Sequence, residues 1–126
     1  MIVYRSFRIH ASRFLPNLSD DHICKRMHGH TFNIKVFIEG EINRTDGFVI
    51  DFYDIDAIFK QYIHPVIDHK VLNQVKGLEN PSSENLCKWI WDNLERHISG
   101  LYRIEVSEDF GTGIIYQPHD EEKRSH

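Results

Sequence analysis

The sequence has little cysteine, no long hydrophobic run and no excess of positive charge. Its two cysteines, Cys24 and Cys87, are too few for the disulfide framework of a small secreted domain. No apolar stretch approaches the length of a transmembrane helix, and the first residues carry no signal-peptide pattern. A formal net charge of -4 argues against nucleic-acid binding. We therefore expect a cytoplasmic protein with reduced thiols that binds neither membranes nor nucleic acid.

The chain does have enough hydrophobic residues for one core, and it is rich in histidine. Its 126 residues are 40% hydrophobic and 27% charged, which is ordinary for one globular domain. It contains 9 histidines, whose positions matter more than their number. We predict a single domain over residues 1–117. The polar residues 118–126 are predicted to form a disordered tail.

Alternating hydrophobicity predicts two strands in the first third of the chain. Over residues 2–13, Phe7, Ile9 and Ala11 share one parity and polar residues share the other, as in a half-buried strand. A second strand is predicted from about residue 28 to residue 42 by the same alternation. The residues between the two strands include proline, asparagine and aspartate and are typical of a loop.

Helical spacing and capping residues predict two helices in the middle of the chain. The first begins near Asp51, a good N-cap, and His64-Pro65 ends or interrupts it. Residues 66–79 have no regular pattern. The second helix begins near residues 80–82, with Pro81 in its first turn, and Gly100 ends it.

Two further strands are predicted over about residues 101–108 and 112–117, with Tyr102, Ile104 and Val106 facing the core. The order is therefore β-β-α-α-β-β, in which the strands pair as hairpins on either side of the helices. This order predicts an α+β domain, a four-stranded antiparallel sheet with two helices on one face. The other face carries Tyr4 and Phe37, so we expect a homo-oligomer formed through the sheet.

A pair of histidines at the start of the second strand indicates a metal site. His28 and His30 are two residues apart, so in a strand their side chains project to the same face. Two imidazoles on one rigid face begin a transition-metal site, and Cys24 nearby is a candidate nucleophile or base. The alternative is a pair of structural histidines at a strand edge and one buried cysteine.

Four segments together resemble the 6-pyruvoyl-tetrahydropterin synthase family. The run from Cys24 to His30 is similar to its Cys-x-x-x-His-Gly-His signature, and residues 68–73 resemble its Asp-His-x-x-Leu-Asn segment. Residues 79–84 resemble its Glu-Asn-Pro-Thr/Ser-Ser-Glu helix start, and Glu108 falls where the family has a pterin-anchoring glutamate. The resemblance covers residues 5–117 in order. It looks closest to the bacterial 6-carboxytetrahydropterin synthase branch, chiefly through Asp-Phe at 51–52 and the segment 88–92.

The resemblance implies a tunnelling fold and a lyase. The strands of a trimer would close into a barrel, two trimers would stack into a hexamer, and active sites would lie between subunits. The substrate would be 7,8-dihydroneopterin triphosphate, in queuosine (7-deazaguanine) biosynthesis, and triphosphate and acetaldehyde would leave. Two alternatives stay open. One is a 6-pyruvoyl-type synthase or a paralogue of altered activity, and the other is a non-catalytic module that binds a pterin or purine.

The resemblance also assigns roles to individual residues. Cys24 matches the catalytic base, His69 the partner that moves protons, and Asp68 the carboxylate that orients it. Glu108 matches the carboxylate that accepts hydrogen bonds from the pterin. Each residue has a structural alternative as well: a small buried thiol for Cys24, a loop cap for Asp68-His69, and a solvated strand end for Glu108.

The metal ligands depart from the family pattern. The family holds Zn²⁺ on three histidines, and His28 and His30 match two of them. The position of the remaining histidine is occupied by Arg13, whose guanidinium has no lone pair to offer a metal. Three interpretations follow. Zinc is absent and Arg13 stabilises an oxyanion or binds a phosphate or carboxylate group; or a strand bulge brings His10 to the metal; or the chain is a paralogue that lost or changed the reaction.

Overall fold

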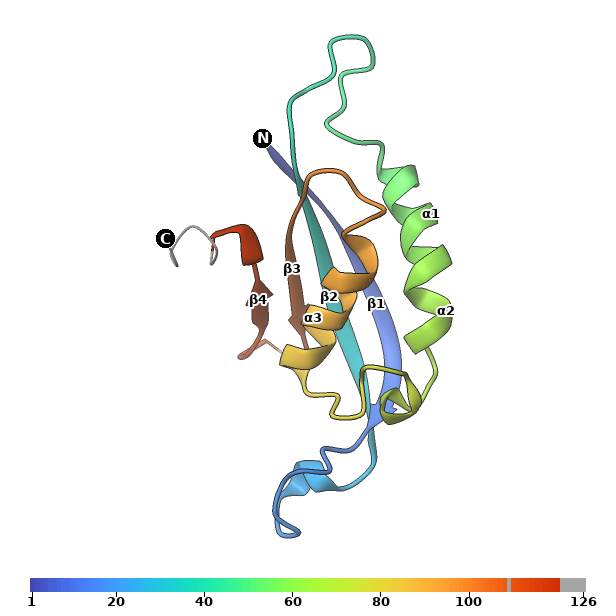
Figure 1. Cartoon of the computed structure of the whole chain (residues 1–126), viewed down its shortest axis with the longest axis vertical. Coiled ribbons are helices and arrows are strands. Elements are labelled where there is room, and N and C mark those ends of the chain that lie inside the picture. The colour runs from blue at the N-terminus through green and yellow to red at the C-terminus, as the bar shows by residue number, and fades with distance from the viewer. Residues whose placement is uncertain (109, 121–126) are drawn as a thin grey trace.

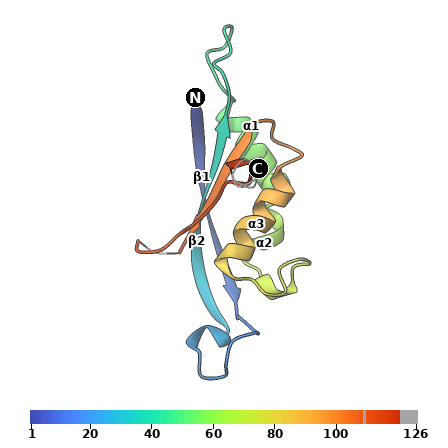
Figure 2. The ribbon, with the colours of Figure 1, turned by 60° about the vertical axis from the view of Figure 1, so that its left-hand side comes forward.

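The computed structural model describes residues 1–108 and 110–120. They form a four-stranded antiparallel sheet in the order β1-β2-β3-β4, and the helices cover one face of it (Figures 1 and 2). The elements, in chain order, are β1 (Ile2–Arg13), η1 (Ile23–Lys25), β2 (His28–Glu39), α1 (Phe52–Tyr62), α2 (His64–Ile67), η2 (Leu72–Gln74), α3 (Ser83–Leu94), β3 (Leu101–Ser107) and β4 (Ile114–Tyr116). The predicted α+β architecture is confirmed, with α2 as a short addition. No helix among the described residues is long and apolar enough to span a membrane.

The long β1–β2 hairpin is the frame of the domain. Its pairing runs in one register from Ile2 opposite Glu39 to Arg13 opposite His28. Alternate residues such as Ile9, Phe32 and Ile34 are fully buried beneath the helices, as the alternating pattern predicts. The second strand ends at Glu39 and not at residue 42, because its pairing with β1 stops where Ile2 faces Glu39 and only Gly40 continues it, through hydrogen bonds with Met1.

Both helices begin where the sequence places their caps; α1 ends just before His64-Pro65, as predicted, and α3 ends earlier than predicted. The Asp51 side chain accepts a hydrogen bond from Tyr53 N at 2.9 Å, which confirms it as the N-cap of α1. Helix α3 is capped by Ser82, so Pro81 precedes the cap and does not lie in the first turn as predicted. Helix α3 also ends at Leu94, well before Gly100.

The start of β3 differs from the prediction because of a bulge. The β2–β3 register shifts between Phe37 and Ile38, so Leu101 pairs with Ile38. The shift turns Leu101 into the core together with Ile104 and Val106, and leaves Tyr102 only half-buried. Sequence parity alone assigned Tyr102 to the core, which is wrong.

The sheet face opposite the helices is open to solvent in the single chain. Tyr4 and Phe37 pack against each other there, with ring centroids 5.3 Å apart, and Tyr4 is 54% exposed. Of the predicted tail, residues 118–120 are helical, and the His119 ring lies 5.6 Å from the Trp91 ring. Residues 121–126 lie outside the described part of the chain.

Gly100 tests the connection between α3 and β3. It has a φ of +81°, and a Cβ there would lie 2.5 Å from the Glu39 carbonyl oxygen. Gly100→Ala should therefore lower the free energy of unfolding by about 3 kcal/mol, from positive-φ strain plus backbone overlap.

Gly47 is the matched control, because it has a φ of +82° but a Cβ there would meet nothing within 4 Å. Gly47→Ala should cost only about 1 kcal/mol. Urea unfolding at one protein concentration measures both, and equal costs would contradict the packing argument.

Candidate active site

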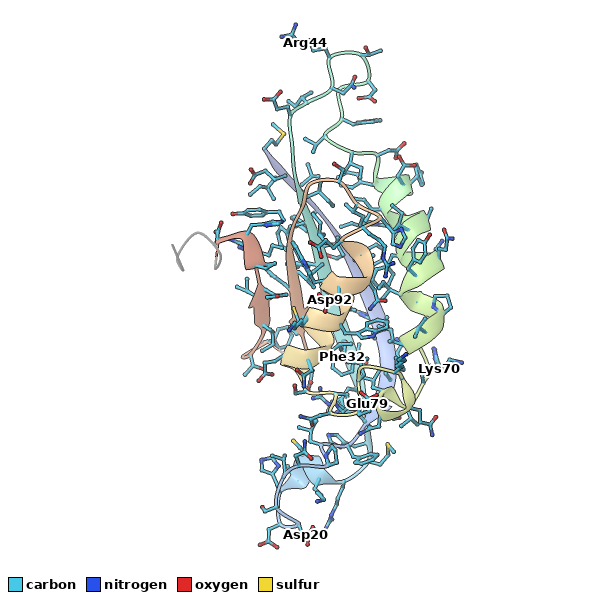
Figure 3. All side chains as sticks on the ribbon, viewed as in Figure 1. Asp20, Phe32, Arg44, Lys70, Glu79 and Asp92 are labelled. Carbon is cyan, nitrogen blue, oxygen red and sulfur yellow. The ribbon has the colours of Figure 1, made fainter. Side chains whose placement is uncertain are left out.

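The candidate residues gather at the end of the sheet where β1 finishes, β2 begins and β3 finishes. Arg13 lies opposite His28 and Ala11 lies opposite His30 in the β1–β2 pairing. In Figure 3, Phe32, Lys70 and Glu79 lie in the half of the molecule nearer the loop that carries Asp20, away from the turn that carries Arg44. The first residues of α3 reach the same end of the sheet.

Arg13 is the charged centre of this end of the sheet. It is only 6% exposed, because it shares the strand parity of the buried residues Ile9 and Ala11. Its Nη1 donates to the Pro81 carbonyl at 3.0 Å and to Ser83 Oγ at 3.2 Å, and its Nη2 forms an ion pair with Glu108 Oε1. The guanidinium carbon also lies 5.1 Å from the centre of the Phe32 ring. A buried guanidinium needs such partners, because desolvating an unpaired charge is costly.

Glu108 is held from several sides. Besides Arg13, its Oε1 accepts a hydrogen bond from Ser83 Oγ at 2.7 Å. Its Oε2 lies 3.3 Å from His30 Nδ1. Glu108 also lines a pocket of about 240 Å³ together with Ser83 and Thr112. Glu108 is therefore not the solvated strand end of the structural alternative, but an oriented carboxylate beside a pocket.

His28 and His30 lie on one face, as the spacing predicts, and their ring centroids are 4.1 Å apart. His28 Nδ1 lies 2.6 Å from the Arg26 carbonyl, and since a carbonyl oxygen only accepts, Nδ1 is the donor. His30 Nε2 is buried and has no hydrogen-bond partner among the described residues. Burial lowers the pKa of His30, and the positive charge of Arg13 lowers it further, against the opposing effect of Glu108. The neutral form of His30 is thus favoured, and its buried Nε2 has no partner among the described residues.

The residues around this histidine pair do not fit a three-histidine zinc site. Across residues 1–108 and 110–120, no group of three His, Cys, Asp or Glu side chains could hold a metal ion. The position opposite His28 carries the Arg13 cation. His10 cannot replace it, because its Nδ1 lies 3.0 Å from Thr31 Oγ1 on the other face of the sheet. The interpretation in which a strand bulge brings His10 to the metal is wrong, because the pairing of β1 with β2 is continuous from residue 2 to residue 13.

Asp68 and His69 form a hydrogen-bonded pair at the outer edge of β1. The Asp68 carboxylate accepts from His69 Nδ1 at 2.7 Å and from the His10 backbone N–H at 2.9 Å, and it lies 3.2 Å from His64 Nε2. Burial by itself raises the pKa of Asp68, but the hydrogen bonds from His10 and His69 and the charges of His64 and His69 outweigh it and lower the pKa. His69 is 75% exposed at its side chain, so its Nε2 is directed outward and is available for proton transfer.

The backbone fixes this pair in place. The His69 N–H donates to the His10 carbonyl at 2.6 Å, and the Ser12 N–H donates to the Lys70 carbonyl at 3.0 Å. His69 itself has a φ of 56°, a left-handed conformation that these contacts impose. His69 lines an open depression of about 490 Å³ together with His10 and Thr31. In the described chain, no hydrogen bond joins this pair to Arg13 or Glu108.

Cys24 lies in the loop that joins β1 to β2. Its carbonyl accepts from Leu15 N at 2.8 Å and its N–H donates to His22 Nδ1 at 3.1 Å. Lys25 Nζ ties the same loop to the Pro16 carbonyl at 3.0 Å. The Cys24 side chain is half-buried and its thiol is free. Within the described residues no hydrogen bond connects that thiol to His69 or Glu108, so one chain does not assemble all the candidate residues.

Two contributors to the site are absent from the sequence interpretation. Ser83 bridges Arg13 and Glu108, and the signal for it is the serine pair at the start of α3, of which Ser82 alone is needed as the cap. His64 contacts Asp68, and the signal is their spacing of four residues across a helical turn.

Comparison with known proteins identifies the family. A family model described as 6-pyruvoyl tetrahydropterin synthase matches residues 2–119. The chain is 34% identical over 120 residues to the 6-carboxy-5,6,7,8-tetrahydropterin synthase of Synechocystis sp., covering 91% of this chain and 92% of that protein. It is 33% identical over 93 residues to the dihydroneopterin monophosphate aldolase of Pyrococcus furiosus, covering 71% and 77%. The solved structure of Caenorhabditis elegans 6-pyruvoyl tetrahydropterin synthase matches with a TM-score of 0.85 at 23% identity, covering 93% and 94%.

The chain therefore belongs to the 6-pyruvoyl tetrahydropterin synthase family. Its fold is the one that the resemblance implies, and the family match covers every candidate residue.

The Arg13–Glu108 ion pair predicts a large loss of stability when the carboxylate is removed. Glu108→Ala leaves a buried guanidinium without a counter-charge and should lower the free energy of unfolding by about 3 kcal/mol. The matched control is Asp56→Ala, which breaks a pair with Arg5, whose side chain is 47% exposed. That change should cost far less, because solvent screens an exposed ion pair. Denaturant unfolding compares the two, and a similar cost for both would contradict the role given to burial.

Asp68 predicts a loss of stability in acid. Because its folded pKa lies below the ordinary value of 3.8, the carboxylate contributes stability that is fully present above pH 3.8 and is lost as the pH falls through the lowered folded pKa. Asp68→Asn should be less stable than the wild type at neutral pH and should lose less stability on acidification. Thermal unfolding from neutral pH into strong acid measures this, and parallel curves for both proteins would contradict it.

Proposed function

We propose that this chain is a pterin-synthase lyase of the 6-carboxytetrahydropterin synthase type, acting on 7,8-dihydroneopterin triphosphate in queuosine (7-deazaguanine) biosynthesis in the cytoplasm. The observation that carries the proposal is the Asp68–His69 pair. Its imidazole is oriented by a carboxylate and exposed at the rim of a depression of about 490 Å³. The 34% identity to a curated 6-carboxytetrahydropterin synthase supports the choice of reaction.

Glu108 is proposed to recognise the pterin ring. Arg13 and Ser83 both engage its Oε1, which fixes the plane of the carboxylate beside the pocket of about 240 Å³. A carboxylate in a fixed plane suits the paired amino and ring N–H donors of a pterin. In this proposal Oε2 is the oxygen that faces the substrate.

Proton transfer at the substrate side chain is proposed to involve Cys24 and His69. Removing a proton from a carbon beside a hydroxyl needs a base, and returning it elsewhere needs an acid. Cys24 would act as the base and His69 would move the proton, with Asp68 holding Nδ1–H so that Nε2 is the exchanging atom. No step is assigned to a metal, because the donor set beside His28 does not fit one.

The complete site is proposed to form between subunits of a trimer or of a dimer of trimers. Within one chain no hydrogen bond among the described residues connects the Asp68–His69 pair with Glu108. Tyr4 is 54% exposed and Ile115 is 60% exposed, which leaves apolar surface near both edges of the sheet for a neighbouring chain. Assembly through these edges would bury that surface.

A second candidate function is cleavage of a dihydropterin side chain. The observation that favours it is Arg13, which replaces a ligand of the family zinc site. A relative that is 33% identical is named as a dihydroneopterin monophosphate aldolase, so a family member of similar distance carries out a different reaction. The candidate functions also include a 6-pyruvoyl-type synthase and a module that only binds a pterin or purine.

Product analysis distinguishes these functions. The purified protein is incubated with 7,8-dihydroneopterin triphosphate, and the products are identified by mass spectrometry. The proposal predicts 6-carboxytetrahydropterin with release of triphosphate and acetaldehyde. A pyruvoyl product would assign a 6-pyruvoyl-type synthase in its place, an aldol-cleaved product would assign side-chain cleavage, and binding without any turnover would indicate the binding module.

The base assignment predicts the effect of one cysteine substitution. Cys24→Ala should lower kcat by about 10²- to 10⁴-fold while substrate binding is retained. Cys87→Ala is the matched control, because Cys87 is fully buried in the core and burial raises its pKa to about 12. That variant should keep its turnover. Steady-state kinetics with a binding assay measures both, and unchanged kcat in Cys24→Ala would overturn the assignment.

A further inference from the structure

We infer that Arg13 stands in place of a metal ion in this site, as a fixed cation that keeps divalent transition metals away from His28 and His30. This inference deepens the proposed function and, for its catalytic consequence, rests on it. The inference rests on one disagreement. The family pattern has three histidines as metal ligands, whereas this chain has Arg13 and its hydrogen-bonded partners at the position of one of them.

The position of Arg13 is that of a metal ligand. Across the hairpin Arg13 is directly opposite His28, and Ala11 is opposite His30. Residues 13, 28 and 30 therefore share one face of two neighbouring strands, and their side chains converge on one place. A histidine at residue 13 would complete three imidazoles there, and an arginine fills the same space with a charge.

That charge works against a metal ion. A guanidinium is permanently protonated and offers no lone pair. It is only 6% exposed, so water screens little of its repulsion for a dication. His30 Nε2 is buried without a partner among the described residues, and the Glu108 carboxylate that lies 3.3 Å from its Nδ1 is already paired with the Arg13 cation. Two histidines beside a buried cation do not form a binding site for a second cation.

The surroundings are built for the guanidinium. The Pro81 carbonyl, Ser83 Oγ and Glu108 Oε1 all accept from it, and the Phe32 ring lies under it at 5.1 Å. Two of these acceptors come from the start of α3 and one from the end of β3. Residues from three separate parts of the chain therefore compensate this one charge, which makes Arg13 an integral part of the site.

The consequence for the site is a change of cation type. In place of an exchangeable metal ion, the site carries one permanent positive charge that is covalently part of the chain. Arg13 acts through Glu108 by holding Oε1, while Oε2, 3.3 Å from His30 Nδ1, keeps a further lone pair for a ligand. Arg13 is therefore a positioning residue, and a variant that loses it should bind the pterin less tightly.

The test is metal uptake by Arg13→His. The full-length protein is purified without a metal-affinity tag, exposed to zinc, dialysed against metal-free buffer and analysed by plasma mass spectrometry. The wild type should retain little zinc, whereas Arg13→His should retain about one zinc per chain and bind it at least about 100-fold more tightly. With Co²⁺, only Arg13→His should give the intense visible bands of a tetrahedral site.

Three control variants distinguish the effect of adding a metal ligand from the effect of removing the arginine charge. Arg13→Gln removes the positive charge without adding an imidazole, and this variant should bind zinc only weakly. Arg13→His combined with His28→Ala should lose the gained metal. Arg8→His adds a histidine on the same strand but on the exposed face, and should resemble the wild type.

The wild type alone can overturn the inference. About one zinc per chain in the wild type, lost on His28→Ala, would contradict it even if Arg13→His does not fold. A folded Arg13→His protein with no more zinc than the wild type would also contradict it. Metal content is measured without substrate, so either result is independent of whether the proposed lyase reaction occurs.

Discussion

The ion pair between Arg13 and Glu108 is the constraint around which this end of the molecule is arranged. It joins the end of β1 to the end of β3 and takes in the first turn of α3 through Ser83. Because Arg13 is almost fully buried, its charge must be balanced inside the protein and not by water. The position of Glu108, and with it the pocket beside α3, follows from that requirement.

The same constraint connects the family fold to an altered site. The sheet and the helices are those of the 6-pyruvoyl tetrahydropterin synthase family. In our proposal Arg13 takes the place of a metal ligand, and its charge is balanced locally by groups that accept hydrogen bonds from it. A relative that is 33% identical is named as a dihydroneopterin monophosphate aldolase, a different reaction from that named for the Synechocystis relative. Replacing a metal ion by an arginine in the active site is a physical means by which related proteins could come to catalyse different reactions.

Much of the fold was predictable from the sequence, because it depends on local patterns. Period-two alternation identified β1 almost to the residue, and Asp51 marked the start of α1. The orientation of Arg13 also followed from parity. Its partners did not, since Glu108 lies 95 residues away in the sequence and Ser83 lies 70 away. The bulge at Phe37 likewise depends on how two strands meet, which no single-strand pattern contains.

The central claim is that a pterin-synthase site works here with an arginine where its relatives would hold a metal. The most direct measurement is the rate of dihydroneopterin triphosphate turnover by the wild type before and after exhaustive dialysis against a strong chelator, with zinc quantified in each sample. We expect the same rate in both samples and little zinc in either. A rate that disappears on chelation and returns with added zinc would contradict it.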